Sequence, residues 1–222
     1  GAEDETEFPA VWDGTKVSGL SDFEGSGTAT DPYLIDNASQ LAYIVSTDIK
    51  DGLYFELVKD IRINDTSTAN WKETAKNWVW ADVRFVGTFD GKGHTIYGLF
   101  HNGSQKRMGL FSYIGDTLIK NVKFSQASIT TSTSEEGAAI VAAQASIYID
   151  ATCSVNAPNV KGVSGIIARS NQNVNITNSI VLGTYTGKSH VGAFFGTFWG
   201  GTQTIKNCFT ASNAPAIPSR TP

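Results

Sequence analysis

An internal repeat with a period of about 28 residues, in the second half of the chain, is the feature that most constrains the fold. The first marker of this repeat is a short apolar run that recurs four times, centred on Phe111, Ile140, Ile166 and Phe194. The second marker also recurs four times, and its copies begin at Ile119, Ile149, Ile176 and Ile205. The spacing between successive copies varies little for either marker. Two markers that keep nearly the same period indicate stacked structural units.

The repeated unit has the pattern of strands and turns. Its apolar runs are short, rich in Val, Ile, Phe and Ala, and interrupted by Gly and Asn, without the 3.6-residue period of a helix. A propeller blade needs about 40 residues or more, whereas about 28 residues suit one solenoid coil of three short strands. We therefore predict an all-β chain that forms a right-handed parallel β-helix, whose coils stack about 4.8 Å apart.

Three position-specific expectations follow from this alignment. Phe111, Ile140, Ile166 and Phe194 should form one inward column, and the recurring Asn121, Asn178 and Asn207 should form a turn ladder that Ala151 interrupts. Asn suits such a turn because it tolerates left-handed backbone. Cys153 and Cys208 would lie two coils apart, too far for a disulfide, and we expect both to be small buried hydrophobic residues.

The N-terminal region predicts a cover for the first coil. Asn37 and Gln40 have the spacing of a capping box, and an amphipathic helix is expected over residues 38–46, between strands at 33–35 and 54–58. The predicted organisation is an acidic tether (1–11), a single β-helix domain (12–212) and a Pro-rich tail (213–222). The domain would comprise a capping region (12–60), a Trp-rich insert (62–84) and the coils (85–212).

Composition narrows the possible partners. Charged residues make up 17% of the chain, against about 25% in average domains, and the net charge is −4. Nucleic acid is therefore not an expected partner, and no apolar run is long enough for a transmembrane helix. We expect an extracellular or cell-surface protein, monomeric and anchored like a lipoprotein after removal of an N-terminal export signal.

Several segments resemble bacterial surface proteins with GLUG repeats. The segments are 25–28, 31–35, 37–43, 54–61 and 85–99, followed by Gly109-Leu110-Phe111 and Ile119-Lys120-Asn121-Val122. Similar segments occur in surface proteins of Bacteroidetes and in the β-helical, non-catalytic region of IgA-cleaving metallopeptidases. The resemblance implies a parallel β-helix, export and surface display. It does not extend to peptidase chemistry, because the His-Glu-x-x-His signature is absent.

The sequence offers no catalytic constellation, cofactor site or metal site. A glycoside hydrolase needs two facing carboxylates, yet Asp150 is the only acid from residue 137 onward. Asp90 and His94 could form an acid–base pair, but the Asp-Gly-Lys-Gly segment that leads from one to the other is typical of a turn. Glu135 and Glu136 lie in a polar loop and should be solvated. His101 and His190 have no evident partner in the sequence.

The Trp-rich insert is the candidate binding segment. Trp71, Trp78, Trp80 and Asp82 are the predicted ligand-binding residues, because an indole combines a large flat face with a polar N–H. The alternative is that these tryptophans are core residues of the solenoid. Trp12 and Trp199 are expected to be packing residues.

We predict a non-catalytic, exported cell-surface interaction or adhesion module that binds a glycan or a host or cell-surface protein. The first alternative is a polysaccharide-active lyase or hydrolase with its site in a groove along the β-helix. The second is a structural stalk that displays another domain. Exposed tryptophans with free polar neighbours would favour the binding module, and clustered carboxylates on one face would favour the enzyme.

Overall fold

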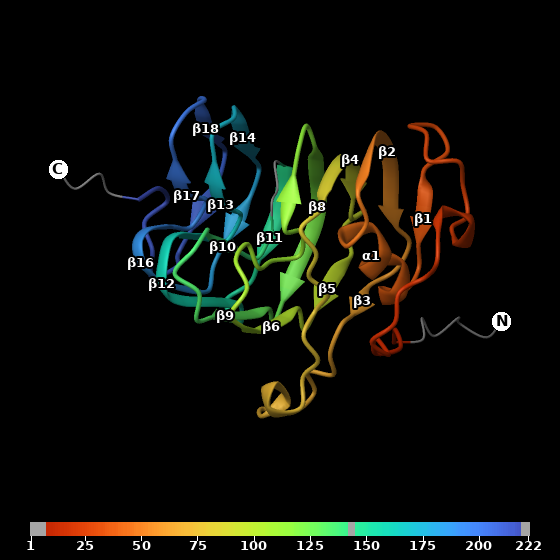
Figure 1. Cartoon of the computed structure of the whole chain (residues 1–222), viewed down its shortest axis with the longest axis horizontal. Coiled ribbons are helices and arrows are strands. Elements are labelled where there is room, and N and C mark those ends of the chain that lie inside the picture. Colours follow the sequence, from red (N-terminus) through yellow and green to blue (C-terminus); the bar gives the residue numbers. More distant parts are fainter. Residues whose placement is uncertain (1–7, 142–144, 219–222) are drawn as a thin grey trace.

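The computed structural model, which describes residues 8–141 and 145–218, is a stack of parallel strands (Figure 1). The largest sheet takes one strand from each successive coil, so its neighbours are parallel and far apart in sequence. Its order is β1 (Tyr33–Ile35), β2 (Ile49–Leu57), β4 (Arg84–Asp90), β8 (Leu118–Ser125), β11 (Ala145–Ile149), β14 (Val174–Thr177) and β18 (Gln203–Lys206). The predicted all-β parallel β-helix is confirmed.

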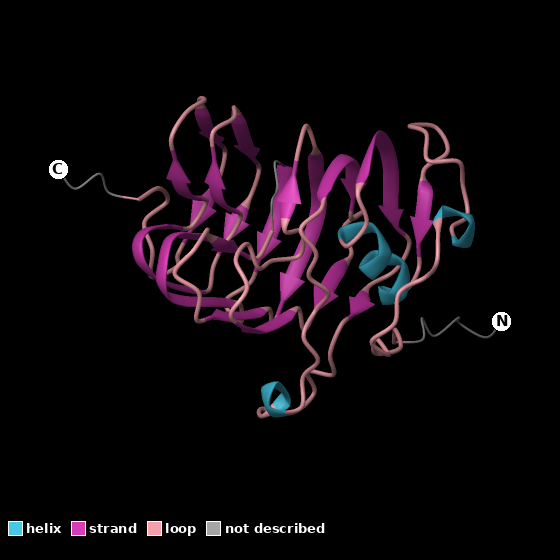
Figure 2. Cartoon of the chain, viewed as in Figure 1, coloured by secondary structure: helices cyan, strands magenta, loops and turns pink. Residues whose placement is uncertain are grey.

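Two smaller sheets and several short strands complete the coils (Figure 2). The second sheet contains β6 (Phe100–Gly103), β9 (Ser128–Thr131), β10 (Ala138–Ala139), β12 (Ser154–Ser164) and β16 (Thr184–Gly192). The third pairs β13 (Ile167–Ser170) with β17 (Phe195–Phe198). The largest sheet also holds β3 (Ile61–Arg62), β5 (Thr95–Tyr97), β7 (Tyr113–Ile114), β15 (Ile180–Val181) and β19 (Phe209–Thr210).

The predicted N-terminal helix is confirmed as α1 (Ala38–Val45), which follows a 3₁₀ turn, η1 (Leu20–Asp22). The Asn37 side chain accepts a hydrogen bond from the Gln40 backbone N–H at 2.9 Å. The Gln40 side chain accepts from the Asp36 backbone N–H at 2.7 Å, one residue before the position expected for a capping box. The helix buries Leu41 and Ile44 completely, so it closes the first coil with an apolar face.

Inward side chains stack in columns that run through the coils. The strand register aligns Phe55 with Phe89 and Phe89 with Ile119, and all three are fully buried. Burial of such a side chain stabilises the fold by roughly 1.5–3 kcal/mol. The four residues of the first marker are each at most 5% exposed, and the pairing of Ile167 with Phe195 sets Ile166 beside Phe194. The core of this protein is therefore a continuous apolar column along the solenoid.

The second marker was misaligned in one coil. Ala145 pairs with both Lys120 and Thr177, so Ser146, and not Ala151, continues the turn ladder. The coil that follows Ser146 is longer than its neighbours, and the bulge of β12 between Ala157 and Lys161 helps to lengthen it. The ladder residues all have left-handed backbone: Asn121, Ser146, Asn178 and Asn207, with φ of 55°, 51°, 52° and 55°.

The described parts of both predicted terminal segments pack on the solenoid. Val11 forms a parallel bridge with Arg62, and the Arg62 guanidinium lies over the Phe8 ring. The carbonyls of Pro215 and Ala216 accept hydrogen bonds from the last coil. Residues 8–11 and 213–218 thus extend the β-helix, and the rest of the predicted tether and tail lies outside the described residues.

The two cysteines are free thiols, as predicted. Cys153 is buried, and burial raises the pKa of its thiol to about 12. Cys208 is only half-buried, contrary to the prediction that both would be core residues. Its coil is the last one, so no further coil covers it in the described part of the chain.

Candidate functional site

The structure buries two of the three tryptophans proposed as ligand contacts. Trp71 lies in η2 (Trp71–Glu73), is 6% exposed and packs edge-on against Phe100. Trp78 is 2% exposed, packs edge-on against Trp12 at a ring distance of 4.9 Å and donates its Nε1–H to the Leu110 carbonyl. Both indoles are committed to the core, so neither offers a free face, and the alternative interpretation of core residues applies to them.

The other two proposed contacts remain at the surface. Trp80 is half-buried and donates its Nε1–H to the Lys106 carbonyl at 2.8 Å. Asp82 is exposed, and its Oδ1 lies 2.5 Å from Nη2 of Arg107. Asp82 therefore belongs to a charged surface to which Arg107, from outside the insert, also contributes.

The side chains singled out for possible catalysis have structural partners. Asp90 Oδ1 accepts from the backbone N–H of Lys92 and from the Asn121 side chain, which holds the turn after β4. His94 Nδ1 instead lies 3.2 Å from Asp60 Oδ1. His101 is fully buried, and its Nε2–H donates to the Gly109 carbonyl. No acid–base pair of Asp90 and His94 is formed.

A row of arginine and aromatic side chains crosses successive coils on one side of the solenoid. We call it the arginine–aromatic face and define it by Arg84, Arg107, Tyr113, Glu136, Arg169 and Trp199. Tyr113 is 40% exposed and Trp199 is 57% exposed. The prediction that Trp199 is a packing residue is wrong, because β17 ends at Phe198 and the indole follows beyond it.

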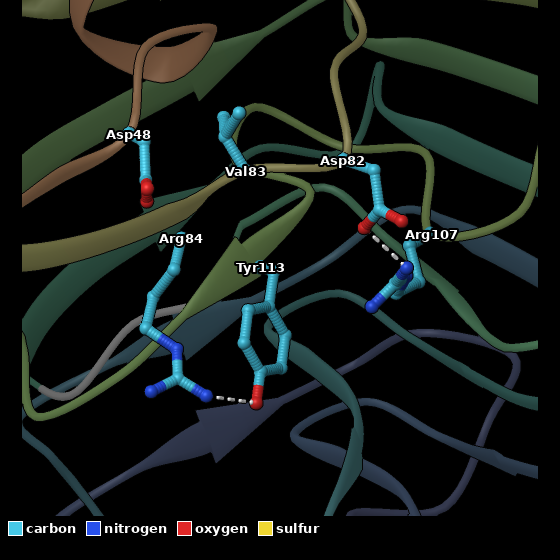
Figure 3. Close-up of a pocket in the computed structure, with 6 residues that line it drawn as sticks. All are labelled: Asp48, Asp82, Val83, Arg84, Arg107 and Tyr113. Carbon is cyan, nitrogen blue, oxygen red and sulfur yellow. Dashed lines mark hydrogen bonds and ion pairs between the residues drawn. The ribbon is translucent and has the colours of Figure 1, made fainter.

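The first part of this face is an open hollow of about 620 Å³ around Tyr113 (Figure 3). Arg84 Nη2 donates to the Tyr113 hydroxyl at 2.7 Å, and the Arg107 guanidinium lies 5.5 Å from the centre of the Tyr113 ring. Asp82 lies beside Arg107 on the same hollow, as the dashed contact shows. The β4–β7 register sets Arg84 opposite Tyr113 and thereby brings the two side chains together.

The second part is an open hollow of about 560 Å³ beside Trp199. The Arg169 guanidinium lies 4.7 Å from the centre of the Trp199 indole. Lys161, Thr197 and Glu135 also line this hollow. The indole thus contacts a cation and shares the hollow with polar and charged groups.

Glu136 joins the two hollows. Its Oε2 lies 3.1 Å from Arg107 Nε, and its Oε1 lies 3.8 Å from Arg169 Nη1. This half-buried carboxylate is not the solvated loop residue that the sequence suggested. It lies between two arginines, one from the coil before it and one from the coil after it, so ion-pair contacts link the two hollows.

Sequence reasoning missed most of this face, although a signal for it was present. Arg84 and Tyr113 are one repeat period apart in the sequence, and so are Arg107 and Glu136. One repeat period separates residues of adjacent coils, so each pair meets across one coil step. Charged and aromatic residues that recur at the repeat period could therefore have pointed to the face.

Among the described residues, no group of three His, Cys, Asp or Glu side chains could hold a metal ion. The helices in the described part of the chain are too short or too polar to cross a membrane. Neither observation assigns a function to the chain.

Comparisons with known proteins give partial matches. No protein-family model matches the chain, and no solved structure matches it. The chain is 33% identical to halomucin of Haloquadratum walsbyi over an aligned segment of 125 residues. This segment makes up 53% of the chain and 1% of halomucin. The chain is also 33% identical over 111 residues to a putative Gly-rich membrane protein of Evansella cellulosilytica, 48% of the chain and 12% of that protein. The chain thus spans a small fraction of either relative.

Proposed function

We propose that this chain is a non-catalytic interaction module of an exported cell-surface protein and that it binds glycan through the arginine–aromatic face. The observation that carries the proposal is the exposure of Tyr113 and Trp199, each in contact with an arginine, in two connected hollows. Flat aromatic rings stack on the apolar faces of sugars, and nearby polar groups bind the hydroxyls. The similarity to a protein named as a membrane protein supports a role at the cell envelope.

The carboxylates of the arginine–aromatic face are in ion pairs with basic side chains, which favours ligand binding over hydrolysis. Asp82 and Glu136 are both in ion pairs with Arg107, and Glu135 lies 3.7 Å from Lys106. A hydrolase would need one of two facing carboxylic acids to be a proton donor. Carboxylates held by cations are suited to orienting arginines, so this face supports recognition better than acid–base chemistry.

A glycan array followed by calorimetry tests the proposal. The double variant Tyr113→Ala/Trp199→Ala should lose binding at least about tenfold relative to the unmodified chain, since each stacking contact is worth on the order of 1 kcal/mol. Tyr54→Ala is the matched control, because Tyr54 is 37% exposed on β2, outside the face. Retained binding in the double variant, or no binding of any glycan by the unmodified chain, would contradict the proposal and favour the stalk.

A further inference from the structure

From the charges and the spacing of the arginine–aromatic face, we infer that its ligand is an extended acidic polysaccharide that lies parallel to the solenoid axis. The inference rests on the proposed function and adds the class and direction of the ligand. Two independent observations support it: the balance of paired and unpaired charges, and the placement of the two aromatic rings on different coils.

The first observation is that each hollow carries one exposed basic side chain outside the ion pairs of the face. The carboxylates that line the two hollows belong to Asp48, Asp82, Glu135 and Glu136. Every carboxylate of Asp82, Glu135 and Glu136 lies within ion-pair distance of a basic side chain. Arg84 and Lys161 are exposed, and neither is within ion-pair distance of a carboxylate in the described ranges 8–141 and 145–218. The chain as a whole has a net charge of −4. These two cations, one at each hollow, can therefore attract carboxylate or sulfate groups of a ligand.

The second observation is the axial spacing of the rings. From Tyr113 to Trp199 the face passes through Glu136 and Arg169, one coil at a time, which gives three coil steps. At about 4.8 Å per step the rings are separated by roughly 14 Å along the axis. One coil step is comparable to the length of one pyranose unit in an extended chain. A linear polysaccharide along the axis can therefore stack one sugar on Tyr113 and another on Trp199.

The hollows suit a chain better than a compact ligand. Both are open to solvent, and the Arg107–Glu136–Arg169 contacts run from one to the other. A small ligand would need an enclosed pocket that removes most of its surface from water. Acidic groups on successive sugars would reach Arg84 at one end and Lys161 at the other.

Calorimetric titration with defined oligosaccharides tests this inference. The probes are oligogalacturonates of two to eight units and neutral malto-oligosaccharides of the same lengths, measured at low and high salt. We expect affinity for the oligogalacturonates to rise until the oligomer spans both rings and then to level off. Arg84→Ala and Lys161→Ala should each lower that affinity about tenfold, because each variant loses a charge-assisted hydrogen bond to an acidic group of the ligand. Added salt should weaken binding of the acidic probes.

Lys123→Ala is the matched control, since Lys123 is an exposed cation of β8 that lies outside the face. Equal affinity for neutral and acidic probes, lost in Tyr113→Ala/Trp199→Ala, would overturn the acidic class and leave glycan binding intact. Full affinity for a disaccharide would overturn the axial arrangement. Absence of binding to every probe, also on the glycan array, would overturn both this inference and the proposed function.

Discussion

Individual side chains of this protein take their properties from the coil positions that bury or expose them. His101 is 1% exposed at the second position of β6, and its Nε2–H donates to the Gly109 carbonyl at 3.1 Å. Burial penalises the imidazolium, so the pKa of His101 is lowered to about 4. His101 is therefore a neutral structural donor between β6 and the following loop.

This burial predicts a dependence of stability on pH. The unfolded chain protonates His101 near pH 6.5, whereas the folded chain does so near pH 4, so unfolding takes up a proton between these values. The free energy of unfolding should thus be highest above pH 6.5 and fall by roughly 3 kcal/mol as the pH falls toward 4. Urea unfolding of the unmodified chain and of His101→Gln checks this. The difference between the two should shrink as the pH falls, and a constant difference would contradict the lowered pKa.

At the scale of elements, turns decide whether one coil can lie directly on the next. Gly183, between β15 and β16, has φ of +96°, and a Cβ there would lie 2.4 Å from the Cys153 carbonyl of the preceding coil. Gly93, between β4 and β5, has φ of +81°, but a Cβ there would meet no atom within 4 Å. Both glycines adopt left-handed backbone. Only Gly183 also leaves room for the preceding coil to approach closely.

Substitution by alanine should separate these two requirements. Gly93→Ala should lower the free energy of unfolding by about 1 kcal/mol, the cost of left-handed backbone in a non-glycine residue. Gly183→Ala should lower it by about 3 kcal/mol or more, because the added methyl group must also displace the coil beneath. Chemical denaturation of both variants measures the difference, and circular dichroism checks that each folds. Equal losses would show that coil contact at Gly183 does not matter.

For the whole molecule, stability should vary along the solenoid axis. Each coil contacts only its neighbours, so an end coil has half the partners of a central one. In the described part of the chain, β8 pairs with β4 on one side and β11 on the other, while β18 pairs with β14 alone. The last coil also leaves Phe209 59% exposed.

Native-state hydrogen exchange should reveal this gradient. Amides of β8 should exchange only on global unfolding, whereas those of β18 should exchange through local opening that costs at least about 2 kcal/mol less. Central strand β4 serves as the internal control, because it also has neighbours on both sides. Equal protection of β18 and β8 would mean that the C-terminal edge is covered, and sedimentation analysis would then identify a second copy.

The sequence by itself determined the solenoid. Its period, the α1 helix with its Asn37 cap and the left-handed Asn121, Asn178 and Asn207 all follow from local patterns of apolar and turn residues. The helix and the turns depend on residues within one coil, and the period appears because the same short pattern recurs in successive coils. The coil with Ser146 was misaligned because Ser146 follows Asn121 by fewer residues than it precedes Asn178, and the β12 bulge contributes to the longer step without an apolar signature.

Only the tertiary structure decided which aromatic residues are exposed and which charges meet. Trp78 and Trp199 are the same residue type, yet Trp78 packs into the core and Trp199 follows the end of β17 at the surface. The face that joins Arg107, Glu136 and Arg169 draws one residue from each of three coils. Such contacts depend on how the coils are stacked, and a pattern read along one chain segment does not contain that information.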